Sequence, residues 1–158
     1  MDKTTRKIRA IFAGLTALLI FALLPTTTQA AALGPRGGYD FDTEQFVIGV
    51  EGEFGRALQA FRFAPSLDFE LGDANSTMFN ADFRLYLFNL PETGLRFYGS
   101  AGPTIVLDSP RDETDIGLSL VAGMKIPMKN QNRYHLETRF GIGDIPDFKL
   151  MAAVMFEL

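Results

Sequence analysis

The sequence predicts an all-β protein, an eight-stranded antiparallel up-and-down transmembrane β-barrel, and three observations lead to this prediction. Apolar residues recur at every second position through eight segments of the chain, which is the period of a β-strand. Short runs of Gly, Pro, Asn, Asp and Ser separate several of these segments. The glycines within the segments lie mostly on the charged face, which indicates that this face lines a narrow interior.

The first 30 residues have the three-part layout of a secretory signal peptide. Four bases in residues 3–9 precede an apolar run over residues 11–24, and small residues follow. The run is shorter than the ~20 residues that a membrane-spanning helix needs, and a retained N-terminal anchor is the alternative. We expect cleavage after Ala30 or Ala32. The predicted division is a signal peptide in residues 1–30 and a barrel domain in residues 31–158, exported into the envelope of a bacterium.

The composition excludes several classes of site. The chain has no cysteine, so it cannot contain a disulfide scaffold, a thiolate metal site or a cysteine nucleophile. Its single histidine leaves little room for an imidazole metal cluster. The formal net charge of −4 argues against nucleic acid as a partner, and loss of the signal peptide would make the protein more acidic. We predict neither a cofactor nor a metal site.

The first half of the predicted barrel domain contains four alternating segments. In the fourth, for example, Phe79, Phe83 and Leu85 alternate with Asp82 and Arg84. Such alternation is typical of a strand with one apolar and one polar face. The four segments are residues 33–41, 46–54, 61–71 and 77–89.

The second half repeats the pattern. Leu118, Leu120 and Met124 share one face of their segment, and Ser119 and Lys125 share the other. Every phenylalanine after residue 30 falls on an apolar face, with the exception of Phe88 in the first half. The four segments are residues 95–107, 115–126, 134–143 and 148–158.

Short turns predict antiparallel hairpins between neighbouring segments. Residues 72–76, 89–94 and 108–113 are rich in turn-forming residues. Eight hairpin-linked strands would leave two open edges, so closure into a barrel is expected. Pro65 and Pro103 fall inside segments, where each removes a ladder donor, and we expect bulges or breaks there.

The position of the glycines decides which face points inward. An eight-stranded barrel has an interior barely wide enough for side chains, so small residues belong inside and the phenylalanine-rich face belongs outside. An outward apolar band on every strand is suited to lipid. The predicted strands have about the length of 9–11 residues that crosses a bilayer when tilted. The glycines on the charged face are Gly34, Gly38, Gly49, Gly102, Gly117, Gly123, Gly141 and Gly143.

The predicted interior is charged and nearly balanced. Buried charges must be paired, because an unpaired ion in a narrow lumen costs several kcal/mol. We therefore expect cross-strand ion pairs that fill the lumen and leave little or no conductance. The predicted lumen network consists of Arg36, Asp40, Glu51, Glu53, Arg62, Asp68, Glu70, Asp82, Arg84, Arg96, Lys125, His135, Glu137, Arg139 and Lys149, with Glu157 on the same face of the last strand.

The signal peptide and the alternating segments resemble those of small outer-membrane β-barrel proteins of the OmpX and OmpA transmembrane-domain type. The resemblance covers residues 33–158, and residues 38–41 and 140–143 are similar to strand segments of such proteins. It implies a non-enzymatic barrel in the bacterial outer membrane with a structural, adhesive or lipid-interacting role. It also implies contact with outer-membrane lipid, lipopolysaccharide and the assembly machinery, and a monomeric state.

Two other functions stay open on the sequence alone. The first is a soluble exported barrel whose apolar face points inward and holds an apolar ligand. The second is a lipid-A-modifying barrel enzyme that uses His135 as a general base beside Glu137. Such barrel enzymes use a histidine with a nearby serine, and no serine occupies the matching place here, so an interior ion-pair cluster is favoured.

One loop carries four acids whose oxygens suit a divalent cation. Their spacing matches no calcium-binding loop, so we favour a solvated acidic loop. The four residues are Asp108, Asp112, Glu113 and Asp115.

Overall fold

The computed structural model describes residues 31–58, 60–72, 76–108 and 113–158, without the side chains of residues 56–58 and 108. The predicted signal peptide in residues 1–30 lies outside these ranges, so its cleavage stays a prediction. Within the described ranges, no helix is long and apolar enough to cross a bilayer.

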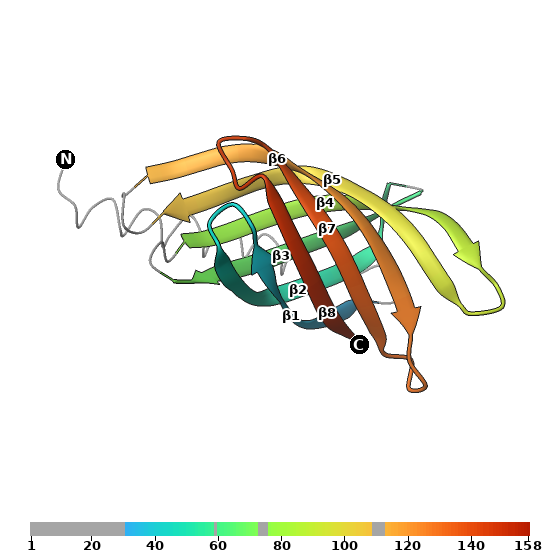
Figure 1. The fold of residues 1–158 in the computed structure, drawn as a ribbon. Coiled ribbons are helices and arrows are strands. Elements are labelled where there is room, and N and C mark those ends of the chain that lie inside the picture. Colours follow the sequence, from blue (N-terminus) through green and yellow to red (C-terminus); the bar gives the residue numbers. More distant parts are fainter. Residues whose placement is uncertain (1–30, 59, 73–75, 109–112) are drawn as a thin grey trace.

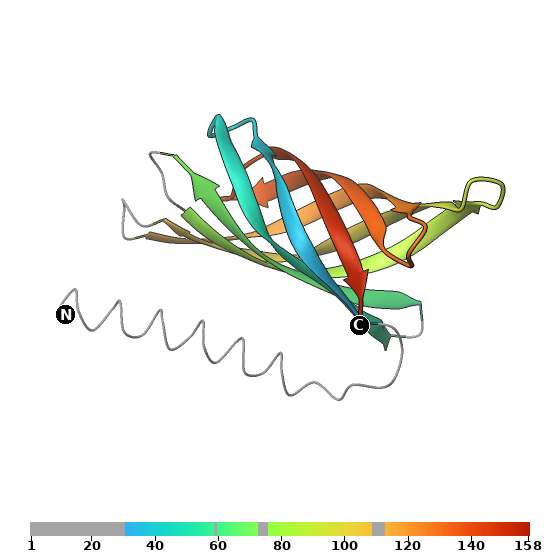
Figure 2. The same ribbon diagram turned by 90° about the horizontal axis from the view of Figure 1, so that it is seen from below.

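Eight strands form one closed barrel, which confirms the predicted fold. Each strand pairs antiparallel with the next, and β1 closes the sheet against β8 (Figures 1 and 2). The strand bounds agree closely with the predicted segments, except that β2 continues four residues beyond its predicted end. The strands are β1 (Ala32–Asp40), β2 (Gln45–Leu58), β3 (Phe61–Leu71), β4 (Ser76–Leu90), β5 (Leu95–Asp108), β6 (Glu113–Pro127), β7 (Arg133–Gly143) and β8 (Phe148–Glu157).

The two ends of the barrel differ in their connections. The β2–β3, β4–β5 and β6–β7 hairpins lie at the end that holds the start of β1 and the end of β8, which we call the terminal end. The connections β1–β2, β3–β4, β5–β6 and β7–β8 lie at the opposite end, the loop end. The β4–β5 hairpin, yellow-green in Figures 1 and 2, projects beyond its neighbours at the terminal end.

The apolar faces of the strands point outward and the charged faces point into the lumen. Phe46, Ile116 and Leu118 are more than half exposed, whereas Arg84 and Asp82 are each 1% exposed. A continuous outward band of large apolar side chains is stable against lipid hydrocarbon. This orientation is the opposite of the one that a soluble barrel with an internal apolar ligand requires.

Strands β3 and β5 continue through Pro65 and Pro103 without a bulge, so the predicted bulges or strand breaks are wrong. Each proline only interrupts the hydrogen-bonded ladder to one neighbouring strand. Pro65 pairs with Ala81 of β4, whereas the β2–β3 ladder skips the pairs at Pro65 and Ala64 and resumes in the same register. Pro103 pairs with Leu118 of β6 and interrupts only the β4–β5 ladder. In an antiparallel strand a residue directs its N–H and C=O toward one neighbour, so a missing donor affects one ladder only.

A β-bulge in β4 turns Phe88 to the outward face, although its sequence parity is that of the lumen. The register shifts between Tyr86 and Phe88, so that Leu87 is the extra residue and Phe88 pairs with Phe97. The two phenylalanine rings stack with centroids 4.6 Å apart and planes at 21°. The bulge therefore brings the one exceptional phenylalanine onto the apolar face.

Glycine on the lumen face makes room for large side chains of the neighbouring strands. Tyr98 is 1% exposed, and its ring lies against its cross-strand partner Gly123. A Cβ added at Gly123 would lie 2.6 Å from the Tyr98 Oη. On the lumen face, glycines thus lie beside bulky side chains, as a narrow barrel requires.

Candidate functional site: the charged lumen

Arg84 on β4 is the centre of a cluster of ion pairs in the middle of the lumen. Its Nη2 donates to Glu51 at 2.8 Å and to Glu137 at 2.6 Å, and its Nη1 donates to Glu53 at 3.0 Å. The guanidinium also lies over the ring of Tyr98, 4.1 Å from the ring centroid. The Tyr98 hydroxyl donates to Glu137 at 2.8 Å. Because these carboxylates lie on β2 and β7, one side chain of β4 links separate walls of the barrel through charge-assisted hydrogen bonds.

His135 on β7 belongs to the same cluster. Its Nδ1 lies 3.1 Å from Glu51 Oε1 and 3.3 Å from Arg84 Nη1. Glu51, His135 and Glu137 bring three ligand-type atoms within 4.8 Å of one another. The guanidinium of Arg84 contacts all three side chains, so it already supplies the positive charge that a metal ion would bring. The geometry is that of an interior ion-pair cluster.

A second group of ion pairs lies closer to the loop end. The Nε of Arg36 is 3.1 Å from Asp68 Oδ1. Arg139 donates to Asp82 at 2.6 Å and to the hydroxyl of Ser119 at 2.8 Å. Ser119 in turn donates to the other oxygen of Asp82 at 2.8 Å. Each of these acids therefore meets an arginine, as a charged interior requires.

Lys149 on β8 forms the ion pairs at the loop end of the lumen. Its Nζ lies 2.9 Å from Asp40 Oδ2 and donates to Glu70 Oε1 at 3.0 Å. Ser76 also donates to Glu70. Asp40 accepts a further hydrogen bond from the N–H of Asp42 at 2.9 Å, so the same carboxylate caps the β1–β2 turn. These contacts join β1, β3, β4 and β8 around the mouth.

Glu53 on β2 gathers the bases of the terminal end. Its Oε1 accepts from Arg62 at 2.6 Å and from Lys125 at 3.0 Å, and Arg133 Nη1 lies 3.9 Å away. Its Oε2 accepts from the Tyr86 hydroxyl at 2.7 Å. One buried carboxylate thus faces several cations at this mouth.

Most of the predicted lumen residues come together in these clusters. The prediction that Arg96 joins this buried network is wrong. Arg96 is exposed and forms no ion pair with any described residue. It keeps the inward parity opposite Lys125, but at this end of the barrel its side chain is open to solvent. The predicted lumen residues that do make ion pairs there are Arg36, Asp40, Glu51, Glu53, Arg62, Asp68, Glu70, Asp82, Arg84, Lys125, His135, Glu137, Arg139 and Lys149.

The terminal rim contains an ion pair that the sequence analysis missed. Arg133 pairs with Glu157 there, and both side chains are partly exposed. Arg133 is the first residue of β7, next to a turn, and the period-two pattern is weakest at such positions. Its register position opposite Met155 of β8 brings it to the mouth.

Ile145 in the β7–β8 loop turns an apolar side chain into the loop end of the barrel, which the sequence pattern did not indicate. Ile145 is 7% exposed and packs in an apolar cluster with Met78 and Val106. Gly117 and Gly141 leave the space that this side chain occupies, because a Cβ added at either would lie 2.9 Å from Ile145. The position of the loop depends on these tertiary contacts.

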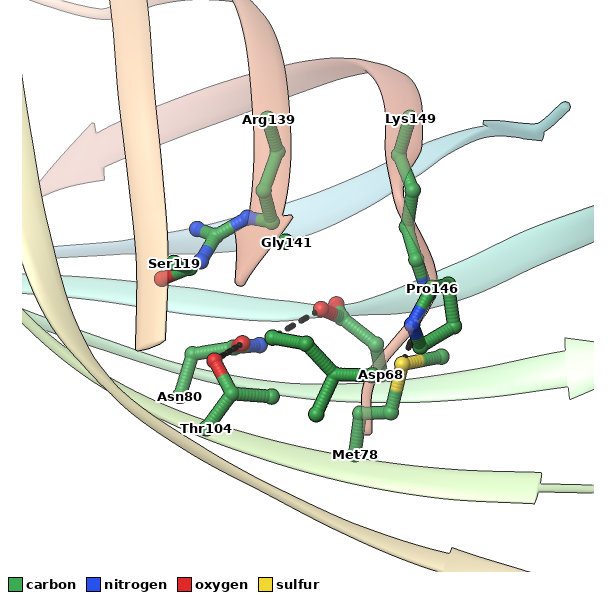
Figure 3. Close-up of a pocket in the computed structure, with 10 residues that line it drawn as sticks. Asp68, Met78, Asn80, Thr104, Ser119, Arg139, Gly141, Pro146 and Lys149 are labelled. Atoms are coloured by element: carbon green, nitrogen blue, oxygen red, sulfur yellow. Dashed lines mark hydrogen bonds between the residues drawn. The ribbon is translucent and has the colours of Figure 1, made fainter. Parts of the chain in front are cut away.

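A cavity of about 10 Å³ lies beside Ile145 (Figure 3). Asn80 crosses it, donating to Asp68 at 2.9 Å and accepting from the Thr104 hydroxyl at 2.8 Å. A volume of this size holds about one water molecule. These hydrogen bonds join β3, β4 and β5 at this level of the lumen. The cavity is lined by Asp68, Met78, Asn80, Thr104, Ser119, Arg139, Gly141, Ile145, Pro146 and Lys149.

The acidic loop considered above falls largely outside the structure. Asp112 and the side chain of Asp108 are not among the described parts of the chain. Glu113 is exposed and Asp115 is partly exposed, where β6 begins.

Comparison with known proteins finds similarity at the level of the fold. The sequence matches no protein-family model and no curated protein. Similar solved structures include the N-terminal β-barrel domain of OprF from Pseudomonas aeruginosa, with a TM-score of 0.66, 17% identity, and coverage of 82% of this chain and 97% of that one. A structure from the de novo design of transmembrane β-barrels matches with a TM-score of 0.63, 9% identity and coverage of 82% and 95%. Neisserial surface protein A matches with a TM-score of 0.51, 12% identity and coverage of 82% and 95%.

These similarities agree with the geometry described above. The outward apolar band, the closed antiparallel sheet and the charged interior are all features of barrels that cross membranes. This chain therefore has the fold of a small eight-stranded transmembrane β-barrel, similar to the β-barrel domain of OprF and to a designed transmembrane β-barrel.

Proposed function

We propose that this chain is a non-enzymatic integral protein of the bacterial outer membrane, with a lumen closed by ion pairs and a structural, adhesive or lipid-interacting role. The observation that carries the proposal is the Arg84 cluster. Its guanidinium bridges Glu51, Glu53 and Glu137 across the lumen at 2.6–3.0 Å. Side chains held in this way tie the walls together and obstruct a continuous water column.

The surroundings of His135 argue against the enzymatic alternative. The histidine is 1% exposed, and its Nδ1 lies beside Glu51 and Arg84 inside the lumen. A lipid acyl ester would have to reach this point through the barrel wall or past the charged side chains. A general base needs its substrate within hydrogen-bonding reach, and this site offers no such access.

The outward surface supports an outer-membrane location. Its large apolar side chains require hydrocarbon around the barrel, and the predicted signal peptide would export the chain from the cytoplasm. Under this proposal the partners are outer-membrane lipid, lipopolysaccharide and the machinery that inserts barrels. A monomer suffices, because the sheet closes on itself and leaves no edge to pair.

Planar-bilayer recording tests the closed lumen. We expect the purified protein to form no stable, large channels, because charged side chains crowd the eight-stranded interior. Reproducible openings of porin size would overturn the closed-lumen proposal. The same recording on Arg84→Ala shows whether removal of the central guanidinium opens a path.

Cell fractionation tests the location. The protein should stay in the outer-membrane fraction after a carbonate wash and should migrate anomalously on a gel until it is boiled. N-terminal sequencing of that material should begin at Ala31 or at Leu33 if cleavage follows Ala30 or Ala32. Release by carbonate would favour the soluble barrel.

A further inference from the structure

The terminal mouth of the lumen holds more bases than its acids can neutralise. Three cationic groups, those of Arg62, Lys125 and Arg133, approach a single oxygen atom, Glu53 Oε1, at 2.6, 3.0 and 3.9 Å. Arg133 has a second acid, Glu157, as a partner. Three positive nitrogen atoms around one oxygen repel one another, and a nearby anion would relieve that repulsion.

The neighbouring ion pairs do not remove this excess. Arg84 also touches Glu53, but its charge is met by Glu51 and Glu137 deeper in the lumen. Arg96 lies opposite Lys125 in the β5–β6 ladder and forms no ion pair within the described part of the chain. Among the strand residues with described side chains, this mouth therefore combines four bases with two acids: Arg62, Arg96, Lys125 and Arg133 with Glu53 and Glu157.

The opposite end of the lumen has the reverse balance. There, within the described ranges, one base, Lys149, faces two acids, Asp40 and Glu70. Summed over the whole lumen, the positive and negative charges nearly balance. They are unevenly distributed, because the positive excess lies at the terminal end. A charged mouth with low-dielectric walls concentrates counter-ions from solution.

Solvent reaches the basic mouth. The side chains of Arg62 and Arg133 are 28% and 19% exposed, although Glu53 beneath them is 1% exposed. Two of these bases also flank the ring of Tyr86, with Arg62 Cζ 5.4 Å and Lys125 Nζ 4.9 Å from its centroid. The cations are thus held by buried groups on one side and open to a ligand on the other.

We propose that this basic mouth, formed by Arg62, Arg96, Lys125 and Arg133, is a binding site for a phosphate monoester dianion. The excess of two positive charges matches the charge of a dianion better than that of a carboxylate. Arginine presents paired donors that fit phosphate oxygens, and lysine adds a point charge. The proposal depends on the fold and on these side chains, and it is independent of the cellular role proposed above.

Titration of the folded protein in detergent micelles with inorganic phosphate tests the site, at constant ionic strength set with chloride. We expect saturable binding by NMR or calorimetry. Arg62→Gln and Arg96→Gln should each weaken it about tenfold, because each removes charge-assisted hydrogen bonds. Arg96→Gln keeps the test valid if Arg62→Gln fails to fold, since Arg96 makes no ion pair with the described residues. Lys129→Gln, which removes an exposed base from the β6–β7 turn, is the matched control and should bind normally.

A second arm uses micelles doped with phosphatidic acid, which carries the same monoester on a lipid, against micelles doped with phosphatidylcholine. Binding in both phosphate arms assigns the mouth to the phosphate group itself. Binding of inorganic phosphate alone assigns it to a soluble ligand, and binding of phosphatidic acid alone assigns it to a lipid headgroup. Absence of saturable binding in every arm, or equal weakening by Lys129→Gln, would overturn the proposal.

Discussion

The guanidinium of Arg84 donates to the carboxylate of Glu137 at 2.6 Å, although the two residues are 53 positions apart and lie on strands that do not pair with each other. The contact crosses the interior of the barrel from β4 to β7. Such a contact adds to the backbone ladders a second set of links, which resists flattening or opening of the sheet. Its energetic weight can be measured, because both groups are buried.

Arg84→Ala should destabilise the folded barrel by about 3–5 kcal/mol, because it leaves buried carboxylates without their partner. Denaturant unfolding in lipid vesicles measures the loss. Arg96→Ala is the matched control, since it removes the same side chain from an exposed position without an ion pair to any described residue, and should change stability by no more than about 0.5 kcal/mol. Equal effects of the two substitutions would mean that the lumen is wet and its charges are screened.

Leu120→Arg places a charge on the lipid face at the central residue of β6. Near the bilayer midplane the substitution should cost about 2–4 kcal/mol of folding free energy in vesicles. Ile116→Arg, nearer the loop end of the same strand, should cost about 0–1 kcal/mol. The depth dependence is the diagnostic result. If both variants insert and fold like the parent, the outward face is not in hydrocarbon.

Gly123→Ala should destabilise the barrel by about 1–3 kcal/mol, because the new methyl group would meet the ring of Tyr98. Displacement of this ring would also weaken its hydrogen bond to Glu137. Gly37→Ala is the control, since a Cβ there would lie 3.5 Å from Val47 O, an ordinary contact. Thermal unfolding of the two variants compares them, and an unchanged Gly123→Ala protein would show that the tyrosine can move without cost.

Phe88→Trp reports directly on the bulge in β4. The chain has no tryptophan, so the new indole is the only one present. Because the bulge turns Phe88 outward, its emission should be blue-shifted and quenched by brominated lipid. Asn89→Trp, on the next residue, should instead be quenched by aqueous iodide. Reversal of the two results would show that the register is continuous and that Phe88 faces the interior.

The sequence alone was sufficient for the strands, their order and the orientation of their faces. This information is local, since Phe79, Phe83 and Arg84 reveal their faces by parity, and short turns make neighbouring strands pair. The glycines indicated which face points inward, because only small residues fit between bulky ones such as Tyr98 in so narrow a lumen. The lumen charges could be assigned by the same parity, from Arg36 to Lys149.

Only the tertiary structure decided the details that depend on register and on the ends of the barrel. Parity fails at Phe88 because one inserted residue reverses every face beyond it. It also gave no sign that Arg96 is exposed, because parity assigns a residue to a face of the sheet but not to a depth in the barrel. Contacts between distant segments determine the partners of Arg84, the packing of Ile145 against two glycines, and the convergence of bases on Glu53. Closure of the sheet brings those segments together. No local pattern in the sequence indicates which side chains then meet across the lumen.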